Sequence, residues 1–306
     1  MSRKIENDEG QINGKMQRKV YDPYWTFAAR NGCILKVMSG RVNRGGPAKK
    51  NLVDKNDFQT SFLRTSIMDI TTSTLQLNTP DGRMGTFEAR PKSDGSYPGI
   101  VVLMEAFGLN DHIKKVTERI AQEGYVAVAP DLYHRESERI VPYSDLQKAI
   151  GIMNRLQDPK VMDDVGAAIA HLKSQSNVKA GSIDVTGFCM GGRFTYLSAA
   201  HHSKDVKAAV VFYGGAIPMG DPSPLSRTGE ISCPIHLFFG GKDPMIPVDH
   251  VNQIKTELTN KKKNFEMKVY PEATHGFFCD ERPSYHAESA KDAWEKTKSF
   301  FAQHLK

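Results

Sequence analysis

Directly after a short apolar run at residues 183–186 comes the segment Gly187-Phe188-Cys189-Met190-Gly191-Gly192, and its pattern dictates the local path of the chain. The segment matches a nucleophile elbow, glycine–any–nucleophile–any–glycine, with cysteine where serine usually stands. The chain turns sharply there from a strand into a helix, so glycine at positions 187 and 191 prevents a collision across the turn. The N–H of Met190 then lies at a helix N-terminus, where it can stabilise an oxyanion. The pattern alone leaves one alternative open, a buried cysteine that only packs between glycines.

The length and composition are those of an ordinary globular protein. The 306 residues suffice to bury a full core, and 39% of them are hydrophobic and 25% charged. No apolar run approaches the roughly 18 residues of a membrane span, so we expect no membrane association. The four cysteines, at positions 33, 189, 233 and 279, have no metal-ligand spacing and follow no secretory signal. We therefore expect a reduced, cytoplasmic protein without a metal site.

The net charge of +6 is carried by the N-terminal segment. Residues 1–66 hold 13 Lys and Arg against 6 Asp and Glu, whereas the rest of the chain holds 28 against 29. The main domain therefore has no basic excess that would indicate nucleic-acid binding. Residues 1–67 lack a helical or strand period, and we expect a basic extension, disordered or loosely docked, before one domain at 68–306. A basic arm that contacts an acidic partner is the alternative.

From residue 70 onward the hydrophobic pattern predicts strands that alternate with helices. Two strands, at 74–77 and 85–89, flank a turn and form an antiparallel hairpin. Further strands are predicted at 99–104, 125–129, 183–186, 208–213, 235–239 and 265–270. Helices are predicted at 111–123, 143–155, 160–175, 190–201, 247–259 and 285–303. This order predicts an α/β fold, a mostly parallel central sheet with helices on both faces and a site at the C-terminal ends of its strands.

A cysteine nucleophile needs a base, and the base needs an acid that orients it. In folds with this elbow the acid and the histidine follow the nucleophile in that order, on loops after later strands. Asp243 follows the strand predicted at 235–239, and His275 follows the strand predicted at 265–270. Taken singly, Asp243 also fits a turn before proline, and His275 a loop histidine bonded to backbone. Together, in this order, they predict a triad with Cys189.

Five segments resemble those of the dienelactone hydrolase (carboxymethylenebutenolidase) family, and they occur in family order within residues 70–303. They are Met104-Glu105-Ala106-Phe107-Gly108-Leu109-Asn110, Pro130-Asp131-Leu132-Tyr133, Gly187-Phe188-Cys189-Met190-Gly191-Gly192, Gly240-Gly241-Lys242-Asp243 and Ala273-Thr274-His275-Gly276-Phe277. The resemblance implies an α/β-hydrolase fold and cofactor-free hydrolysis of a carboxylic ester or an enol-lactone. We expect a small-molecule substrate, no nucleic-acid or membrane partner, no metal, and a monomer or dimer.

The resemblance also implies roles for individual residues. Cys189, Asp243 and His275 correspond to the catalytic triad, in which the cysteine forms a thioester acyl-enzyme. Glu105 corresponds to a glutamate that holds the resting thiol, and a salt bridge to a nearby arginine or lysine is its alternative role. The oxyanion hole is expected at the N–H groups of Ala106 and Met190. Substrate contacts are expected from Arg135, Tyr133, Phe107 and Phe277.

One position departs from the family pattern. Dienelactone-specific members hold the substrate carboxylate with two arginines; Arg135 stands at the first position, but Cys279 stands at the second, four residues after His275. Arg282 is close in sequence but needs a different loop path. A paired arginine clamp is therefore not expected, and a broad carboxylesterase or thioesterase is the alternative function. A second alternative is a non-catalytic member that binds ligands or proteins, which the intact triad opposes.

Overall fold

The computed structural model describes residues 67–306. Apart from residue 67, the extension predicted at 1–67 lies outside the described residues. The strands are β1 (Ile70–Thr79), β2 (Gly82–Pro91), β3 (Tyr97–Leu103), β4 (Val126–Pro130), β5 (Val178–Phe188), β6 (Val206–Phe212), β7 (Ile235–Gly240) and β8 (Phe265–Tyr270). The helices are α1 (Asp111–Gln122), α2 (Leu146–Met153), α3 (Asp158–Ser174), α4 (Met190–His201), α5 (Val248–Asn260) and α6 (Ala287–Leu305), with one 3-10 helix, η1 (Pro224–Glu230). Every strand and helix predicted from the pattern is present.

All eight strands form one sheet in the order β1-β2-β4-β3-β5-β6-β7-β8. β1 and β2 form the predicted antiparallel hairpin, and β2 is also antiparallel to β4. Every other neighbouring pair is parallel, which confirms the predicted mostly parallel sheet. The chain passes from β3 outward to β4 and then returns to the other side of β3 as β5. This reversal makes a switch point between the C-terminal ends of β3 and β5, the place where sheets of this kind bind ligands.

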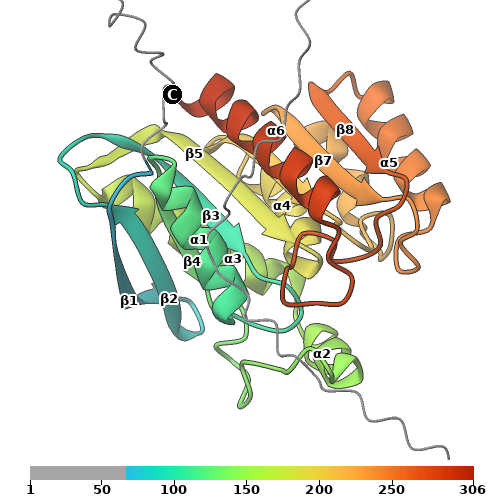
Figure 1. The fold of residues 1–306 in the computed structure, drawn as a ribbon, viewed down its shortest axis with the longest axis horizontal. Coiled ribbons are helices and arrows are strands. Elements are labelled where there is room, and N and C mark those ends of the chain that lie inside the picture. The colour runs from blue at the N-terminus through green and yellow to red at the C-terminus, as the bar shows by residue number, and fades with distance from the viewer. Residues whose placement is uncertain (1–66) are drawn as a thin grey trace, which may run out of the picture. The chain divides into compact units, whose positions relative to one another are not determined.

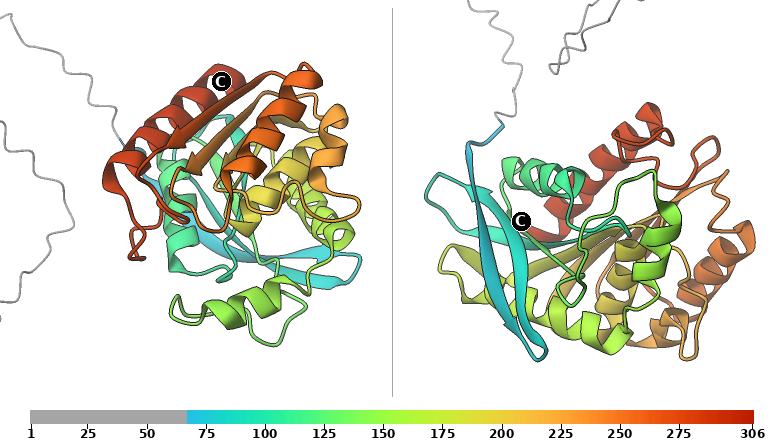
Figure 2. Two further views of the ribbon diagram at one scale, coloured as in Figure 1. Left: turned by 90° about the vertical axis from the view of Figure 1, so that its right-hand side faces the viewer. Right: turned by 90° about the horizontal axis from the view of Figure 1, so that it is seen from below.

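Helices cover both faces of the sheet, as Figures 1 and 2 show. α1 and α6 lie on one face, and α3, α4 and α5 lie on the other. α1 turns its apolar side chains Ile113, Val116 and Ile120 to the sheet, where all three are buried. β3 lies in the middle of these layers, and its residues from Ile100 to Leu103 are fully buried. The core therefore fixes β3 and β5 firmly, and both strands end at the switch point.

Two features of the fold were not predicted. β5 begins at Val178, five residues before the apolar run that marks it in the sequence. Its early residues Lys179 and Ala180 are exposed, and the pairing with β3 shifts register between Tyr97 and Gly99, so no apolar pattern marks this part. η1 was also missed, because a short 3-10 turn carries no hydrophobic period long enough to read.

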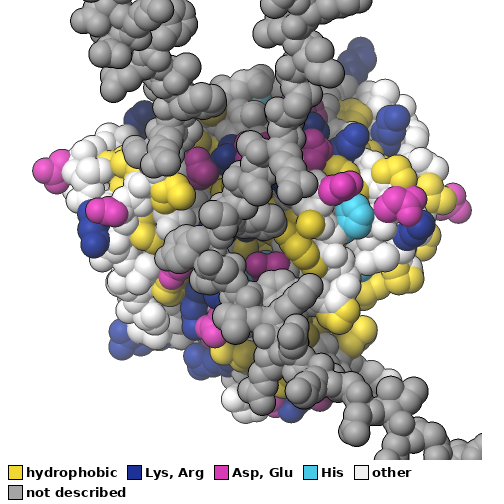
Figure 3. Space-filling view, in the orientation of Figure 1, with side chains coloured by type: hydrophobic (Ala, Val, Ile, Leu, Met, Phe, Trp, Pro, Cys, Tyr) yellow, Lys and Arg dark blue, Asp and Glu magenta, His cyan; other side chains and the backbone are white. Residues whose placement is uncertain are grey.

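Charged side chains of both signs are interspersed on the face of the molecule that Figure 3 shows. This mixture agrees with the balance of 28 basic and 29 acidic residues in the chain after residue 66. Within residues 67–306, no helix combines the length and the apolar character that crossing a membrane requires.

Candidate active site

Cys189 lies at the turn between β5 and α4, at the switch point of the sheet. Its backbone has φ +56° and ψ −117°, a conformation that non-glycine residues rarely adopt and that is costly unless the surroundings impose it. The surroundings are tight, because a Cβ at Gly187 would overlap the carbonyl oxygen of Gly191 and a Cβ at Gly191 would overlap that of Leu103. The Cys189 N–H donates to the carbonyl of Phe212 at 3.0 Å, which ties the turn to β6. The sequence therefore holds the thiol at the tip of a strained turn.

His275 and Asp243 come from the loops after β8 and β7, and the fold brings them together. His275 Nδ1 donates to Asp243 Oδ2 at 2.8 Å, and both side chains are buried. The other carboxylate oxygen, Oδ1, accepts from the N–H groups of Met245 at 2.8 Å and Ile246 at 3.2 Å. These bonds fix the carboxylate, and the carboxylate fixes the histidine ring with Nε2 away from the acid. His275 Nε2 has no hydrogen-bond partner within residues 67–306.

The protonation of His275 is linked to Cys189. Burial by itself lowers the pKa of His275, but the negative charge of Cys189 and the hydrogen bond to Asp243 outweigh burial and raise this pKa to about 10. The imidazolium form of His275 is therefore stabilised by its neighbours at the site. Since the thiolate is the reactive form of cysteine, this arrangement suits nucleophilic attack.

Glu105 lies just after β3, fully buried, and it is paired with Arg282. Arg282 Nη1 donates to Glu105 Oε1 at 3.3 Å, whereas Oε2 has no hydrogen-bond partner in the described part of the chain. The guanidinium lies over the ring of Phe107 at 5.1 Å and near that of Tyr143 at 5.8 Å. It also packs directly against Gly276, where any Cβ would overlap it. A cation therefore stands beside the histidine loop, with its side chain 14% exposed.

The Glu105–Arg282 pair differs from the main expectation for Glu105. The resemblance implied a bond to the resting thiol of Cys189, but the hydrogen bond that Glu105 makes here is to Arg282, the alternative role. Arg282 reaches the site because the chain folds back after Gly276, whose φ of +77° permits a turn and leaves room for the guanidinium. The sequence placed Arg282 near the family position but did not predict this path, so Arg282 was not among the expected substrate-binding residues.

The residues expected at the oxyanion hole and around the substrate are buried. Met190 is the first residue of α4, and Ala106 follows Glu105 after β3. The Tyr133 hydroxyl donates to the carbonyl of Ala106 at 2.8 Å, so this hydroxyl holds the backbone of the expected oxyanion hole. Phe107 packs under Arg282, and Phe277 is fully buried beside His275 in the chain. Tyr133 thus shapes the site through the backbone.

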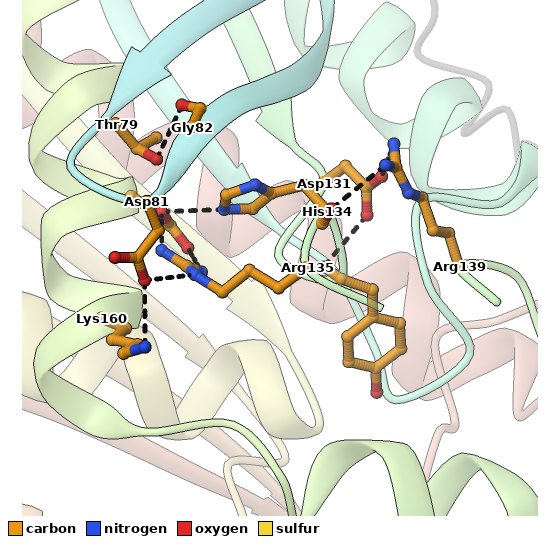
Figure 4. A network of polar contacts seen from close by, with 10 residues as sticks. Thr79, Asp81, Gly82, Asp131, His134, Arg135, Arg139 and Lys160 are labelled. Carbon is orange, nitrogen blue, oxygen red and sulfur yellow. Dashed lines mark hydrogen bonds and ion pairs between the residues drawn. The ribbon is translucent and has the colours of Figure 1, made fainter. Parts of the chain in front are cut away.

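Arg135, which the resemblance implied as a substrate contact, is bonded to two carboxylates of the chain itself. Its Nη1 and Nη2 donate to the two carboxylate oxygens of Asp164 at 2.7 and 2.9 Å, and its Nε donates to Asp81 at 2.8 Å. His134 Nε2 lies 3.2 Å from the same Asp164, and Lys160 lies 3.2 Å from Asp81. This network joins α3 to the β1–β2 turn, as Figure 4 shows. The Arg135 guanidinium is already bound to two carboxylates, so these contacts oppose the expected role in substrate binding.

Cys279, at the position of the family's second arginine, belongs to a buried polar cluster. Its thiol donates to the Tyr143 hydroxyl at 3.3 Å, and Asn110 Nδ2 donates to the same hydroxyl at 2.9 Å. His112 Nδ1 lies 3.6 Å from Asp280. Burial lowers the pKa of His112, but hydrogen bonds with Asp280 and Cys279 outweigh it and raise this pKa to about 9. Sequence reasoning assigned His112 no partner, because the partners come from a loop more than a hundred residues away.

Three comparisons with known proteins agree with this architecture. A sequence profile described as "Dienelactone hydrolase family" matches residues 84–305. The chain is 37% identical over 247 residues to a "Putative carboxymethylenebutenolidase" of Synechocystis sp., a match that covers 78% of this chain and 99% of the relative. A solved "Putative Dienelactone Hydrolase" from Klebsiella pneumoniae is 34% identical, with a TM-score of 0.71 over 77% of this chain and 100% of that one. The chain therefore belongs to the dienelactone hydrolase family and is a hydrolase of ester or lactone bonds with an α/β-hydrolase fold.

Proposed function

We propose that the protein hydrolyses carboxylic esters or enol-lactones through a Cys189–His275–Asp243 triad and a covalent thioester. The observation that carries the proposal is the 2.8 Å bond between His275 Nδ1 and Asp243, together with the strained backbone of Cys189. The bond orients the imidazole so that Nε2 is free for proton transfer. The strain supports a functional reading, because a cysteine that only packs has no need of an unfavourable φ.

The first half of the reaction forms the thioester. The Cys189 sulfur adds to the substrate carbonyl carbon, and the carbonyl electron pair moves to the oxygen. The N–H groups of Ala106 and Met190 stabilise this oxyanion by donating hydrogen bonds to it. The intermediate then collapses, the carbon–oxygen bond to the leaving group breaks, and His275 gives its proton to the departing oxygen. In a lactone the leaving group stays attached to the acyl chain.

The second half returns the free enzyme. Neutral His275 takes a proton from water, and the resulting hydroxide adds to the thioester carbonyl. Collapse breaks the carbon–sulfur bond and releases the carboxylic acid, with the proton returned to the Cys189–His275 pair. Asp243 stays ionised throughout and stabilises the imidazolium in each half.

Arg282 supports a substrate that carries a negative group close to the scissile bond. Of its five N–H donors, one bonds to Glu105, and the guanidinium lies on the Phe107 ring near the histidine loop. A planar guanidinium backed by an aromatic ring suits a carboxylate. The proposal therefore favours anionic esters and lactones, with Arg282 taking the part that the resemblance implied for Arg135.

Turnover by the purified protein tests the proposal. The panel contains dienelactone, a neutral aryl acetate, an aryl ester with a carboxylate in its acyl group, and a thioester. We expect turnover of the lactone and the anionic ester, with acyl-enzyme trapped on Cys189 and detected by mass spectrometry. Faster turnover of the thioester than of all oxygen esters would favour the thioesterase alternative, and no turnover of any member would refute the proposal.

A further inference from the structure

Tyr213 stands at the end of β6, next to the strand that carries the nucleophile, in an unusual backbone conformation. Four non-glycine residues within 67–306 have positive φ: Cys189, Tyr213, Ala216 and Lys262. Tyr213, at φ +37°, is the bulkiest of them, and for such a side chain this conformation is a true outlier. Cys189 and Tyr213 follow the paired ends of β5 and β6, where Phe188 lies opposite Phe212. Strain is therefore held at the site by two neighbouring strand ends.

The Tyr213 hydroxyl is also unusual, because it is buried and makes no hydrogen bond to the described residues. Three other buried tyrosines satisfy theirs: Tyr133 with the Ala106 carbonyl at 2.8 Å, Tyr196 with Thr228 at 2.6 Å, and Tyr270 with Asp292 at 2.8 Å. A buried donor without an acceptor destabilises the fold, and phenylalanine would fill the same space without that penalty. Strain and an unused hydroxyl together indicate that this tyrosine serves the site rather than the fold.

Tyr213 packs against the histidine of the candidate triad. Its ring lies edge-on to that of His275, with 5.2 Å between centroids. Burial raises the pKa of Tyr213 well above the ordinary value, and the charge of the Glu105 carboxylate raises it further. The hydroxyl therefore keeps its proton and can act only as a hydrogen-bond donor or acceptor. Glu105 has a buried oxygen, Oε2, that lacks a partner among the described residues.

We propose that Tyr213 is a positioning residue, whose hydroxyl donates to Glu105 Oε2 when an anionic substrate engages Arg282. This inference rests on the proposed function. Glu105 is fully buried, and its one ion pair within residues 67–306 is with Arg282. When the substrate anion shares the guanidinium, the carboxylate loses part of its compensation, and an uncompensated buried charge is strongly unfavourable. The Tyr213 proton supplies the replacement, so Arg282 can turn to the substrate without Glu105 leaving its place.

Alkylation of Cys189 tests the inference without requiring turnover. Iodoacetate and iodoacetamide react with a thiolate in the same way, displacing iodide, but iodoacetate carries a carboxylate and iodoacetamide does not. We compare both rates at neutral pH for wild type, Tyr213→Phe and Tyr196→Phe, counting only the Cys189 peptide by mass spectrometry. Tyr213→Phe should slow iodoacetate about tenfold, or about 1.4 kcal/mol, and leave iodoacetamide within about twofold. Tyr213→Phe should also melt no lower than wild type.

Tyr196→Phe is the matched control, because it removes a hydroxyl from another fully buried tyrosine that does have a partner. It should lower the melting temperature and change neither alkylation rate. Equal rates in wild type and Tyr213→Phe, an equal loss for both reagents, or a Tyr213→Phe protein that fails to fold would each overturn the inference. Should wild type alkylate at Cys189 but hydrolyse no ester, the proposed function fails, and the alkylation rates still decide the role of Tyr213.

Discussion

The buried polar cluster around Cys189 and the one around Asp164 differ in how many of their polar atoms are hydrogen-bonded. Around Asp164, both carboxylate oxygens are bonded, to Arg135 at 2.7 and 2.9 Å and to His134 at 3.2 Å. Around Cys189, three buried atoms have no partner in residues 67–306: His275 Nε2, Glu105 Oε2 and the Tyr213 hydroxyl. Positive φ occurs at Cys189 and Tyr213 as well. The central carboxylate of the first cluster is bonded through both oxygens, whereas the second cluster holds several buried atoms without a partner among the described residues.

This difference helps to distinguish residues that stabilise the fold from residues that serve the reaction, where both stand in or near family motifs. Leaving a buried donor or acceptor unpaired costs about 1–3 kcal/mol, so a chain keeps such atoms together only where a ligand or transition state will use them. Arg135 stands in a family motif, and three of its five N–H donors already bond to Asp164 and Asp81, which joins α3 to the β1–β2 turn. Arg282 stands outside the expected motif, and the one hydrogen bond of its guanidinium to a residue of 67–306 is the bond to Glu105. The number of N–H donors already in hydrogen bonds therefore distinguishes the two arginines better than their positions in the sequence do.

The largest effect is expected from a substitution that removes the nucleophile of the Cys189 cluster and leaves the fold intact. Cys189→Ala removes the nucleophile and should lower kcat by about a thousandfold or more on every ester that wild type turns over. Cys233→Ala is the matched control, since burial raises the pKa of Cys233 to about 12 and leaves that thiol inert. Steady-state kinetics on both variants measure this effect. Turnover retained in Cys189→Ala would remove the central residue of the comparison.

The second effect breaks the Asp164 cluster and should leave the chemistry intact. Asp164→Asn keeps the shape of the side chain but removes the charge that Arg135 and His134 face. Removing one partner of a buried ion pair typically lowers the free energy of unfolding by about 3–5 kcal/mol. Urea denaturation measures the loss, and kcat per folded molecule should stay at the wild-type value. A variant with normal stability and reduced kcat would reverse the roles of the two clusters.

The third effect compares the two arginines directly. Arg282→Ala should lower kcat/KM for an anionic ester about tenfold to a hundredfold relative to a neutral ester, because it removes a charge-assisted bond to the substrate. Arg135→Ala should leave that ratio within about twofold and lower the melting temperature instead. The ratio of kcat/KM values for an anionic ester and a matched neutral ester reports specificity independently of the fraction of protein that is folded and active. A loss of specificity in Arg135→Ala alone would restore the role that the resemblance implied.

The sequence predicted the fold and the order of the candidate triad because both depend on local patterns. Apolar runs such as the one in β3 report burial directly, and the glycines at 187 and 191 report a tight turn. The sequence named Arg282 as a nearby arginine without predicting its loop path, and it gave no sign of Tyr213. The position of Arg282 depends on how the loop after Gly276 folds back, and Tyr213 reads as one more aromatic residue at a strand end. Hydrogen-bond partners and φ angles leave no periodic pattern in the sequence, so only the three-dimensional structure reveals them.

Asp184 provides a test of whether unpaired atoms alone mark function. It lies in β5, opposite Ile100 and Ala208 and four residues before the end of the strand, with both carboxylate oxygens buried and unpaired among the described residues. Burial raises the pKa of Asp184 well above its ordinary value, so the folded chain binds a proton at this group more tightly than the unfolded chain does. The unfolded chain ionises it near the ordinary pKa of about 3.9. This group therefore makes the fold less stable as the pH rises above that value.

Asp184→Asn should raise the free energy of unfolding by about 1 kcal/mol at neutral pH, because the amide gives up no ionisation in the unfolded state. The gain should shrink toward zero near about pH 4, where unfolded Asp184 is protonated too. Urea midpoints of both proteins at several pH values measure the difference, and kcat should not change. Asp184 lacks one feature of the Cys189 cluster, since neither Asp184 nor its cross-strand neighbours Ile100 and Ala208 have a positive φ. A fall in kcat with unchanged stability would show that even an isolated unpaired carboxyl group serves the site. Backbone strain, rather than unpaired polar atoms, would then be what distinguishes the Cys189 cluster from the Asp164 cluster.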